Sequence, residues 1–283
     1  MSTNENKDKK AEVTALQAIS AEDRKDWISL AFVQAGICVC VPAFLLGALL
    51  AEAMPIWPAI ISGSLGYLIV VVGMVATGMI GCDLGLASCT CCQAGFGKSG
   101  ARFIVSTIFA VNMIGWFGIQ NGVCGEAFSN AMLAMTGWDI PVVVSNTIWG
   151  IIMLLTAVYG VHALEKLDKI SIPLLMIIMC YGTFLAFKVY GTGNLNDEGT
   201  VQSMSFMSGV ALSFNFTAVG TITGPDYTRF QKSRKDTVKS VFYGVFPMGV
   251  ITLIMGIVLT KLSGQYDISM VLIEVGLPLL GII

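Results

Sequence analysis

Residues 30–50 read "LAFVQAGICVCVPAFLLGALL". The stretch has the length and the apolar character of a helix that crosses a bilayer, which needs roughly 20 residues. Gly36 and Pro42 stand near its middle, and Pro42 removes the hydrogen bond to the carbonyl of Cys38, four residues earlier. A free carbonyl at membrane depth needs a partner. This stretch therefore predicts a membrane helix that is interrupted where a cation, a ligand or another helix can bind.

The whole chain has the composition of a membrane protein. Of its 283 residues, 55% are hydrophobic and only 12% are charged, and this charged share is about half that of an ordinary soluble domain. Several apolar stretches are near spanning length, and they cover about 28–50, 59–81, 102–124, 141–161, 170–190, 203–224 and 240–262. A further stretch begins near Ile268, and the sequence ends at Ile283. We therefore expect an all-α polytopic membrane protein, truncated after about seven and a half transmembrane helices of a longer transporter.

Positively charged residues predict the orientation of these spans. With the N-terminus inside, the inside segments hold 14 of the 16 Lys and Arg, and only Lys188 and Lys261 fall outside. The positive-inside rule then predicts a cytoplasmic N-terminal tail over 1–26 and a transmembrane transporter domain over 27–283, in contact with the lipid of the cell (plasma) membrane. The net charge of −2 carries no signal for nucleic acid, and no obligate protein partner is evident.

The cysteines do not predict a metal site or disulfides. Cys89, Cys91 and Cys92 fall in a loop that this orientation places in the reducing cytoplasm. Others lie within spans, where Cys behaves as a small hydrophobic residue: Cys38, Cys40, Cys124 and Cys180. A zinc site needs a second cluster of ligands, whereas the sequence has one histidine. We therefore expect no metal and no resident cofactor.

The sixth apolar stretch resembles the first in its interruption. It reads "SGVALSFNFTAVGTITGPDYTRF" over 208–230, with Gly220 and Pro225 toward its end. Pro225 frees the carbonyl of Thr221. Secondary transporters use broken helices at corresponding positions of two repeats to build their binding sites, and the first and sixth spans correspond if a repeat has five helices. For either span alone, a harmless proline kink is the alternative interpretation.

The third span carries polar residues at membrane depth, in and around "GWFGIQNG" at 115–122. Asn112, Trp116 and Gln120 are four residues apart and so share one helix face, which we expect to contact a ligand. An indole supplies a flat stacking surface, and a carboxamide one turn away supplies a donor and an acceptor. This combination suits a planar heterocyclic amide better than a carboxylate or a sugar. Alternatively, Trp116 only packs and Gln120 only bonds a neighbouring helix.

Another face of the same span is built from small residues. Its glycines recur at three- and four-residue spacing, which favours close contact with a neighbouring helix: Gly115, Gly118 and Gly122. We expect a second transmembrane helix to pack against this face.

Three motifs resemble the nucleobase-cation-symport family, which includes cytosine permeases and hydantoin transporters. They are "GICVCVP" in the first span, "GWFGIQ" in the third and "GPDYTRF" at the end of the sixth. The resemblance extends from Asp26 to the end of the chain. It implies a LeuT-like fold of twelve helices with five-plus-five inverted repeats, the first over about 28–190 and part of the second over about 203–283. It also implies symport of a flat nucleobase or related ring with sodium or protons.

The resemblance also implies which residues hold the ring. In that family the ligand lies between a third-span tryptophan, which matches Trp116, and an aromatic residue of the sixth span. The family position falls at or beside Thr217, so we expect Phe216 to be the second ring, with Phe214 as the next choice. Asn215 or Thr217 is expected as a polar neighbour. A glutamine of the hydantoin transporters matches Gln120.

The cation site and the gate are expected at the broken ends of the spans. Family members bind the cation with backbone carbonyls of the first helix, for which Cys38 and Val41 are the candidates, and with hydroxyls of the eighth helix. Those hydroxyls lie beyond this sequence, so we expect the chain alone not to transport. Asp226 is expected to close the inner mouth by pairing with Arg229 or with another basic group. Alternatively, the basic residues here only set the topology of the spans and contact lipid headgroups.

Three functions remain open on the sequence alone. The first is a symporter for a nucleobase, with cytosine as the first candidate and with uracil, allantoin, hydantoin and purines as others. The second is an amino-acid carrier of the same architecture. The third is a channel or an intramembrane enzyme, although a single histidine and no metal set speak against an enzyme.

Overall fold

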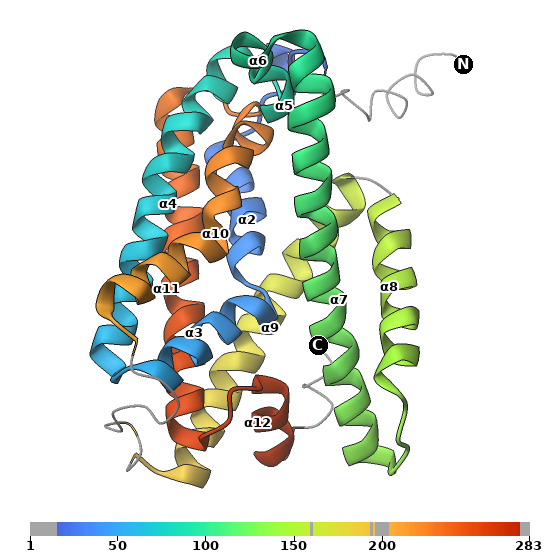
Figure 1. The fold of residues 1–283 in the computed structure, drawn as a ribbon, viewed down its shortest axis with the longest axis vertical. Helices are drawn as coiled ribbons and strands as arrows, with labels where there is room; N and C mark the ends of the chain where they lie inside the picture. The colour runs from blue at the N-terminus through green and yellow to red at the C-terminus, as the bar shows by residue number, and fades with distance from the viewer. Residues whose placement is uncertain (1–15, 159–160, 193–194, 196–203, 278–283) are drawn as a thin grey trace.

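The computed structural model describes residues 16–158, 161–192, 195 and 204–277 (Figure 1). Within these ranges the chain is helical, and its β-structure is limited to one isolated bridge between Lys25 and Gln231. The first helices are α2 (Trp27–Cys38), α3 (Val41–Ala53), α4 (Ile56–Leu84), α5 (Ser88–Cys91), α6 (Gln93–Gly100) and α7 (Ser106–Thr136). They are followed by α8 (Val142–Val158), α9 (Val161–Tyr190), α10 (Phe206–Thr228), α11 (Arg234–Ser263) and α12 (Ile268–Glu274).

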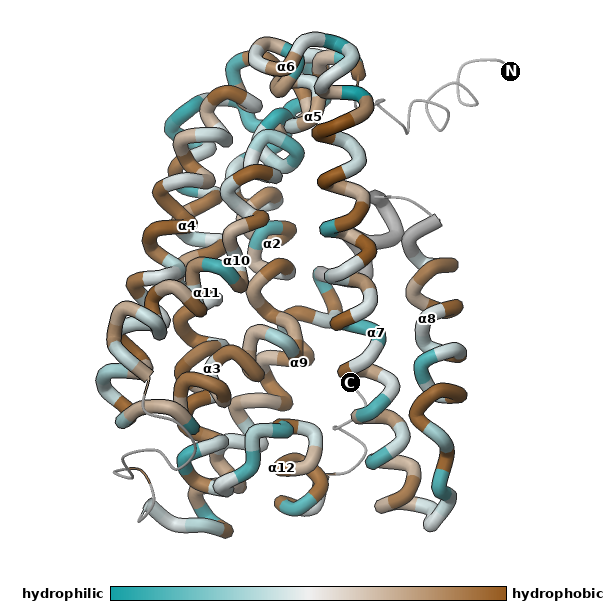
Figure 2. Tube along the Cα trace, in the orientation of Figure 1, coloured by the Kyte–Doolittle hydropathy of each residue, from teal (hydrophilic) through white to brown (hydrophobic). Residues whose placement is uncertain are grey.

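The helices match the predicted membrane spans. In the described ranges, 5 helices are long and apolar enough to cross a membrane, or 6 if the bent pair of α2 and α3 is one span. The predicted fourth span is the shorter helix α8, of 17 residues. Hydrophobic residues predominate along α3, α4 and α11, whereas hydrophilic residues gather toward α5 and α6 (Figure 2). The prediction of an all-α polytopic membrane protein is therefore confirmed.

The third span is longer than predicted. We expected it to end near residue 124, but α7 continues to Thr136. The extension contains the polar residues Glu126 and Ser129. Ser129 is nevertheless compatible with the helix because its hydroxyl donates to the carbonyl of Ile140, 2.5 Å away. A polar side chain with a local partner costs little inside a membrane helix.

The break in the first span is confirmed, although its position differs slightly. Helix α2 ends at Cys38, α3 begins at Val41, and the two are bent by 52°. Cys40 between them has extended backbone angles (φ −147°, ψ 156°). Pro42 lies in the first turn of α3, where its missing N–H is not needed. Gly36, which we expected to belong to the break, lies inside α2 instead.

The predicted break in the sixth span was wrong. Helix α10 runs without interruption through Gly220 and Pro225. The carbonyl of Thr221, which Pro225 frees, accepts a hydrogen bond from the Thr77 hydroxyl of α4 at 2.6 Å. Because a neighbouring helix satisfies this carbonyl, the proline does not have to open the helix for a ligand.

This partnership predicts the effect of Thr77→Val. The substitution keeps the side-chain shape but leaves the Thr221 carbonyl unpaired, which costs about 1–3 kcal/mol. We expect the melting temperature of the detergent-solubilised protein to fall by roughly 5 °C. Thr147→Val is the matched control, because the Thr147 hydroxyl is exposed and bonds only Val143 of its own helix. Equal melting temperatures for both variants would contradict the role given to Thr77.

Helices α4 and α10 are tied together along much of their length. The Ser213 hydroxyl donates to the carbonyl of Gly63, and the Thr228 hydroxyl donates to that of Gly78, both at 2.7 Å. Helices α3 and α11 approach equally closely, since a Cβ on Gly47 would overlap the backbone of Leu253. Helices α2, α3, α4, α10 and α11 therefore form one packed group, and α7 and α8 stand together beside it (Figure 1).

The small-residue face of α7 does not have the predicted role. A Cβ placed on Gly115, Gly118 or Gly122 would meet no atom within 4 Å among the described residues. The close approach of α7 to another helix occurs further along, where Gly125 lies against Asn146 of α8. Glycine spacing alone cannot show which of several small residues meets a neighbour.

Part of the predicted N-terminal tail is packed against the helices. Residues 1–15 lie outside the described residues. The N–H of Ile19 donates to the carbonyl of Gly85 at 2.9 Å, and that of Lys25 donates to Phe230 at 2.7 Å. Arg24 donates to the carbonyls of Cys82 and Gln231 at 2.9 and 3.0 Å. Residues 19–25 thus bridge the end of α4 and the connection between α10 and α11.

Candidate functional site

Two aromatic rings meet between α7 and α10. The centroids of Trp116 and Phe216 are 5.2 Å apart, and their planes lie at 86° in an edge-to-face arrangement. Phe216 also packs against the hydrophobic core around Tyr67 and Met74. The structure therefore brings together the two rings expected from the third and sixth spans, and it anchors the second ring on the tightly packed α4–α10 pair.

The polar residues of α7 lie on the same face as Trp116. Asn112, Trp116 and Gln120 are each partly buried, whereas Ile114 and Ile119 beside them are 70% and 51% exposed. The four-residue spacing thus places the three side chains on one face, which is turned toward the rest of the protein. The Oδ1 atom of Asn112 is buried and has no hydrogen-bond partner in the described part of the chain.

The other predicted residues of α10 differ in their surroundings. Phe214 is partly buried, and its backbone nitrogen lies close to Gly66 of α4. Asn215 is exposed. Thr217 is buried, and its hydroxyl donates to the carbonyl of Ser213 in the same helix at 3.1 Å. Among the predicted α10 residues, Phe216 is the one with a ring contact to Trp116.

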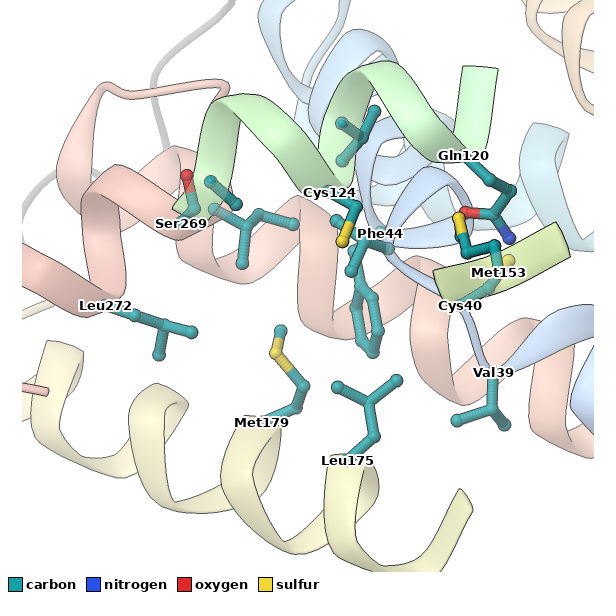
Figure 3. A pocket seen from close by; sticks show the side chains of 14 residues that line it. Val39, Cys40, Phe44, Gln120, Cys124, Met153, Leu175, Met179, Ser269 and Leu272 are labelled. Carbon is teal, nitrogen blue, oxygen red and sulfur yellow. The ribbon is translucent and has the colours of Figure 1, made fainter. Parts of the chain in front are cut away.

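A cavity of about 230 Å³ adjoins the break in the first span (Figure 3). It lies between α3, α7, α8, α9 and α12, and Gln120 lines it together with Val39, Cys40 and Val41 from the break. Its walls are apolar or sulfur-containing apart from Gln120 and Ser269, and no charged side chain lines it. Such a lining favours an uncharged ligand that is oriented by few polar groups.

Cys38 and Val41, the candidates for a cation site, flank the break. Cys38 is fully buried at the end of α2. No N–H four residues later can bind its carbonyl, because that residue is Pro42. Val41 is the first residue of α3, so its carbonyl already belongs to the hydrogen-bond ladder of that helix. The two candidates are therefore not equivalent, and Cys38 has the carbonyl that the helix leaves free.

Cysteine does not form a metal site in the described ranges, where no cluster of three or more His, Cys, Asp or Glu could hold an ion. Cys91 and Cys92 lie in and beside the short helix α5. Burial, followed by neighbouring negative groups, raises the pKa of both thiols. They therefore stay protonated at neutral pH and are poor ligands and poor nucleophiles.

Asp226 and Arg229 interact electrostatically but do not form a close ion pair: burial lowers the pKa of Arg229, and the charge of Asp226 opposes that shift. An oxygen of Asp226 accepts a hydrogen bond from the backbone N–H of Ser88, the first residue of α5, at 3.0 Å. The guanidinium of Arg229 lies 4.8 Å from the ring centre of Phe230. Within the residues that the structure describes, no ion pair joins Asp226 to Arg229. Asp226 instead connects the end of α10 to the turn that follows α4, because a carboxylate suits the N-terminus of a helix.

Sequence reasoning missed two contributors to the cavity. Cys40 was assigned only to a span, yet its side chain projects from the break into the cavity beside Gln120 (Figure 3). The signal that could have found it was its position inside the interruption that Pro42 predicts. Ser269 of α12 also lines the cavity, and no local pattern pointed to it.

Residues 19–275 match the family model described as "Permease for cytosine/purines, uracil, thiamine, allantoin". Cytosine permease of Escherichia coli (strain K12) is 28% identical over 264 residues, which cover 92% of this chain and 61% of that protein. Purine-uracil permease NCS1 of Arabidopsis thaliana is 25% identical over 247 residues, which cover 78% of this chain and 41% of that protein. The chain therefore spans less than two thirds of the length of these relatives.

Solved structures of Mhp1 share the fold. One shows Mhp1, a nucleobase-cation-symport-1 family transporter, in a closed conformation with bromovinylhydantoin bound, and it matches with a TM-score of 0.82 at 18% identity. This match covers 95% of the present chain and 63% of Mhp1. An inward-facing conformation of Mhp1 matches with a TM-score of 0.77. The predicted LeuT-like transporter fold is therefore confirmed, and the chain belongs to the family of membrane permeases for cytosine and purines, uracil, thiamine and allantoin.

Proposed function

We propose that this chain forms the ligand-binding part of a secondary transporter that imports a nucleobase, with cytosine as the first candidate, together with a cation. The observation that carries the proposal is the meeting of Trp116 and Phe216 between α7 and α10, while Gln120, one turn from Trp116, lines the cavity at the break in the first span. Aromatic rings bind the faces of a planar ring, and a carboxamide binds its polar edge. The names of the relatives support the same class of ligand.

In this proposal each residue has a defined role. Trp116 and Phe216, whose rings touch edge to face in this structure, separate to stack on the ring, and Gln120 and Asn112 bind its edge. Phe214, Asn215 and Thr217 of α10 are assigned to the surroundings of the site, because Phe216 is the α10 residue whose ring meets Trp116. The coupled cation, sodium or a proton, binds at the Cys38 carbonyl with Val41 nearby, since this carbonyl has lost its helical partner.

The proposal also covers the arrangement in the membrane. We infer that the N-terminus and the α5–α6 segment face the cytoplasm across the plasma membrane, because the Lys and Arg residues concentrate at that end. Residues of about 28–190 then form the first repeat, and 203–283 belong to the second. Asp226 acts at the inner mouth by holding α5, and Arg229 lies beside it.

Ligand binding tests the proposal directly. We expect the purified protein in detergent to bind labelled cytosine saturably, with displacement by an excess of related planar rings (uracil, hydantoin or adenine) and not by leucine. A comparison of sodium with choline buffer reports on the ion, because a bound cation that favours the ligand-bound state lowers the apparent Kd. Displacement by leucine alone would instead identify an amino-acid carrier, and the absence of displacement by any of the rings would overturn the nucleobase assignment.

A further inference from the structure

The first turns of α2 and α11 lie side by side at one end of the molecule. Lys232, just before α11, forms an ion pair of 2.6 Å with Asp26, the residue before α2. Further along, a Cβ on Gly244 of α11 would lie 2.6 Å from the carbonyl oxygen of Ala31 in α2. The two helices are therefore in backbone contact, and their outward-facing side chains form one continuous surface, the α2–α11 junction.

Aromatic rings from both helices cover this junction. The ring centres of Trp27, the first residue of α2, and Tyr243 of α11 are 5.9 Å apart, and those of Tyr243 and Phe242 are 5.4 Å apart. Tyr243 is 56% exposed, and Ile28 and Phe32 of α2 are 54% and 44% exposed. Trp and Tyr suit the headgroup level of a bilayer, because their rings have an apolar body and a polar edge. The junction thus offers an apolar surface to an acyl chain, next to an aromatic rim.

Two lysines stand at this rim. Lys235 and Lys239 are four residues apart on α11, so they share one face of the helix with Tyr243. Both lysines are exposed, and the ammonium of Lys239 lies 5.8 Å from the ring centre of Trp27. Neither lysine forms an ion pair with a residue that the structure describes.

The carboxylates beside these two helix starts already have partners. Asp26 pairs with Lys232. Asp236 accepts a hydrogen bond from the hydroxyl of Ser233, the N-cap of α11, at 2.9 Å and so acts on the positive end of that helix. The two ammonium groups therefore carry a positive charge that an anion from outside the protein complements.

We infer that the α2–α11 junction is a binding site for an anionic phospholipid, whose phosphate is held by Lys235 and Lys239 and whose acyl chains lie on the exposed apolar side chains, among them Tyr243 and Phe32. A phosphate oxygen and an ammonium group form a charge-assisted hydrogen bond, and basic sites between transmembrane helices are typical places for anionic headgroups. A choline headgroup adds a cation beside the two lysines, so the site favours the anionic lipid. This inference goes beyond the proposed function and does not depend on it, because lipid binding needs no nucleobase.

Native mass spectrometry of the purified protein in a neutral detergent tests the site. Phosphatidylglycerol and phosphatidylcholine with the same oleoyl chains are titrated separately, and the Kd of the first bound lipid is compared. We expect the wild type to bind phosphatidylglycerol about tenfold more tightly than phosphatidylcholine. Lys235→Gln combined with Lys239→Gln is expected to remove this preference, whereas Lys235→Arg combined with Lys239→Arg keeps the charge and should retain it.

Lys188→Gln is the matched control. Lys188 of α9 also lies over an aromatic ring, 4.7 Å from the ring centre of Phe184, and its removal should leave the preference unchanged. Substitutions of exposed lysines have small effects on stability, so melting temperatures close to that of the wild type show that every variant is folded.

Each outcome decides for or against the site. Equal Kd values of the two lipids for the wild type would overturn the inference, and so would a preference that survives the double glutamine substitution. An equal loss of preference in Lys188→Gln would show a general effect of surface charge and would overturn it as well. A wild type that prefers phosphatidylglycerol but does not bind cytosine would refute the proposed function and leave the lipid site standing.

Discussion

Trp116→Ala is expected to weaken the binding of cytosine by roughly ten- to a hundredfold. Stacking of a base on an aromatic side chain contributes about 1–3 kcal/mol, and the indole of Trp116 is the larger of the two rings that meet between α7 and α10. Trp116→Phe keeps an aromatic face and should recover part of the affinity. The measurement is equilibrium binding of labelled cytosine to the purified variants.

Phe117→Ala is the matched control for this prediction. Phe117 is the next residue of α7, and its side chain is 42% exposed, on a different face of the helix from Trp116. Its removal deletes an aromatic ring from the same turn and should leave the Kd of cytosine unchanged. If Phe117→Ala weakened binding as much as Trp116→Ala, the loss would reflect damage to α7, and the stacking role of Trp116 would be refuted.

Much of the site could be predicted because it follows from spacing along one helix. Residues four apart on a long helix share a face, so Asn112, Trp116 and Gln120 could be placed together from the sequence. The meeting of Trp116 with Phe216 required more, since it joins positions 100 residues apart in the chain. Only the resemblance to a family supplied that pairing, and the structure shows the two rings in contact.

The two proline positions show where prediction from sequence stops. Pro42 and Pro225 each remove one hydrogen bond, and local reasoning treats them alike. Pro42 stands at the start of a separate helix, whereas Pro225 lies inside a continuous one. The difference comes from Thr77, which satisfies the carbonyl freed by Pro225 from 144 residues away in the sequence. A tertiary partner of this kind leaves no signal near the proline.

Gly256→Ala is expected to lower the stability of the protein by about 3 kcal/mol, because a Cβ at this position would overlap the carbonyl oxygen of Phe44. The other atoms that this Cβ would approach also belong to the backbone of α3. A rotamer change cannot relieve that contact, so α3 and α11 must move apart, and overpacking of this kind costs about 1–3 kcal/mol or more. We expect the melting temperature in detergent to fall by roughly 10 °C.

Gly118→Ala is the control that separates the packing effect of Gly256→Ala from the effect of alanine on helix propensity. Alanine favours a helix over glycine by about 1 kcal/mol, so without a steric conflict both substitutions should stabilise. A Cβ added to Gly118 would meet no atom within 4 Å among the described residues, and this substitution should leave the melting temperature unchanged or raise it. The two variants are thus expected to change stability in opposite directions. A rise for Gly256→Ala would show that α3 and α11 are not in backbone contact, and the break between α2 and α3 would then lose its support, because α3 is held in place chiefly by α11.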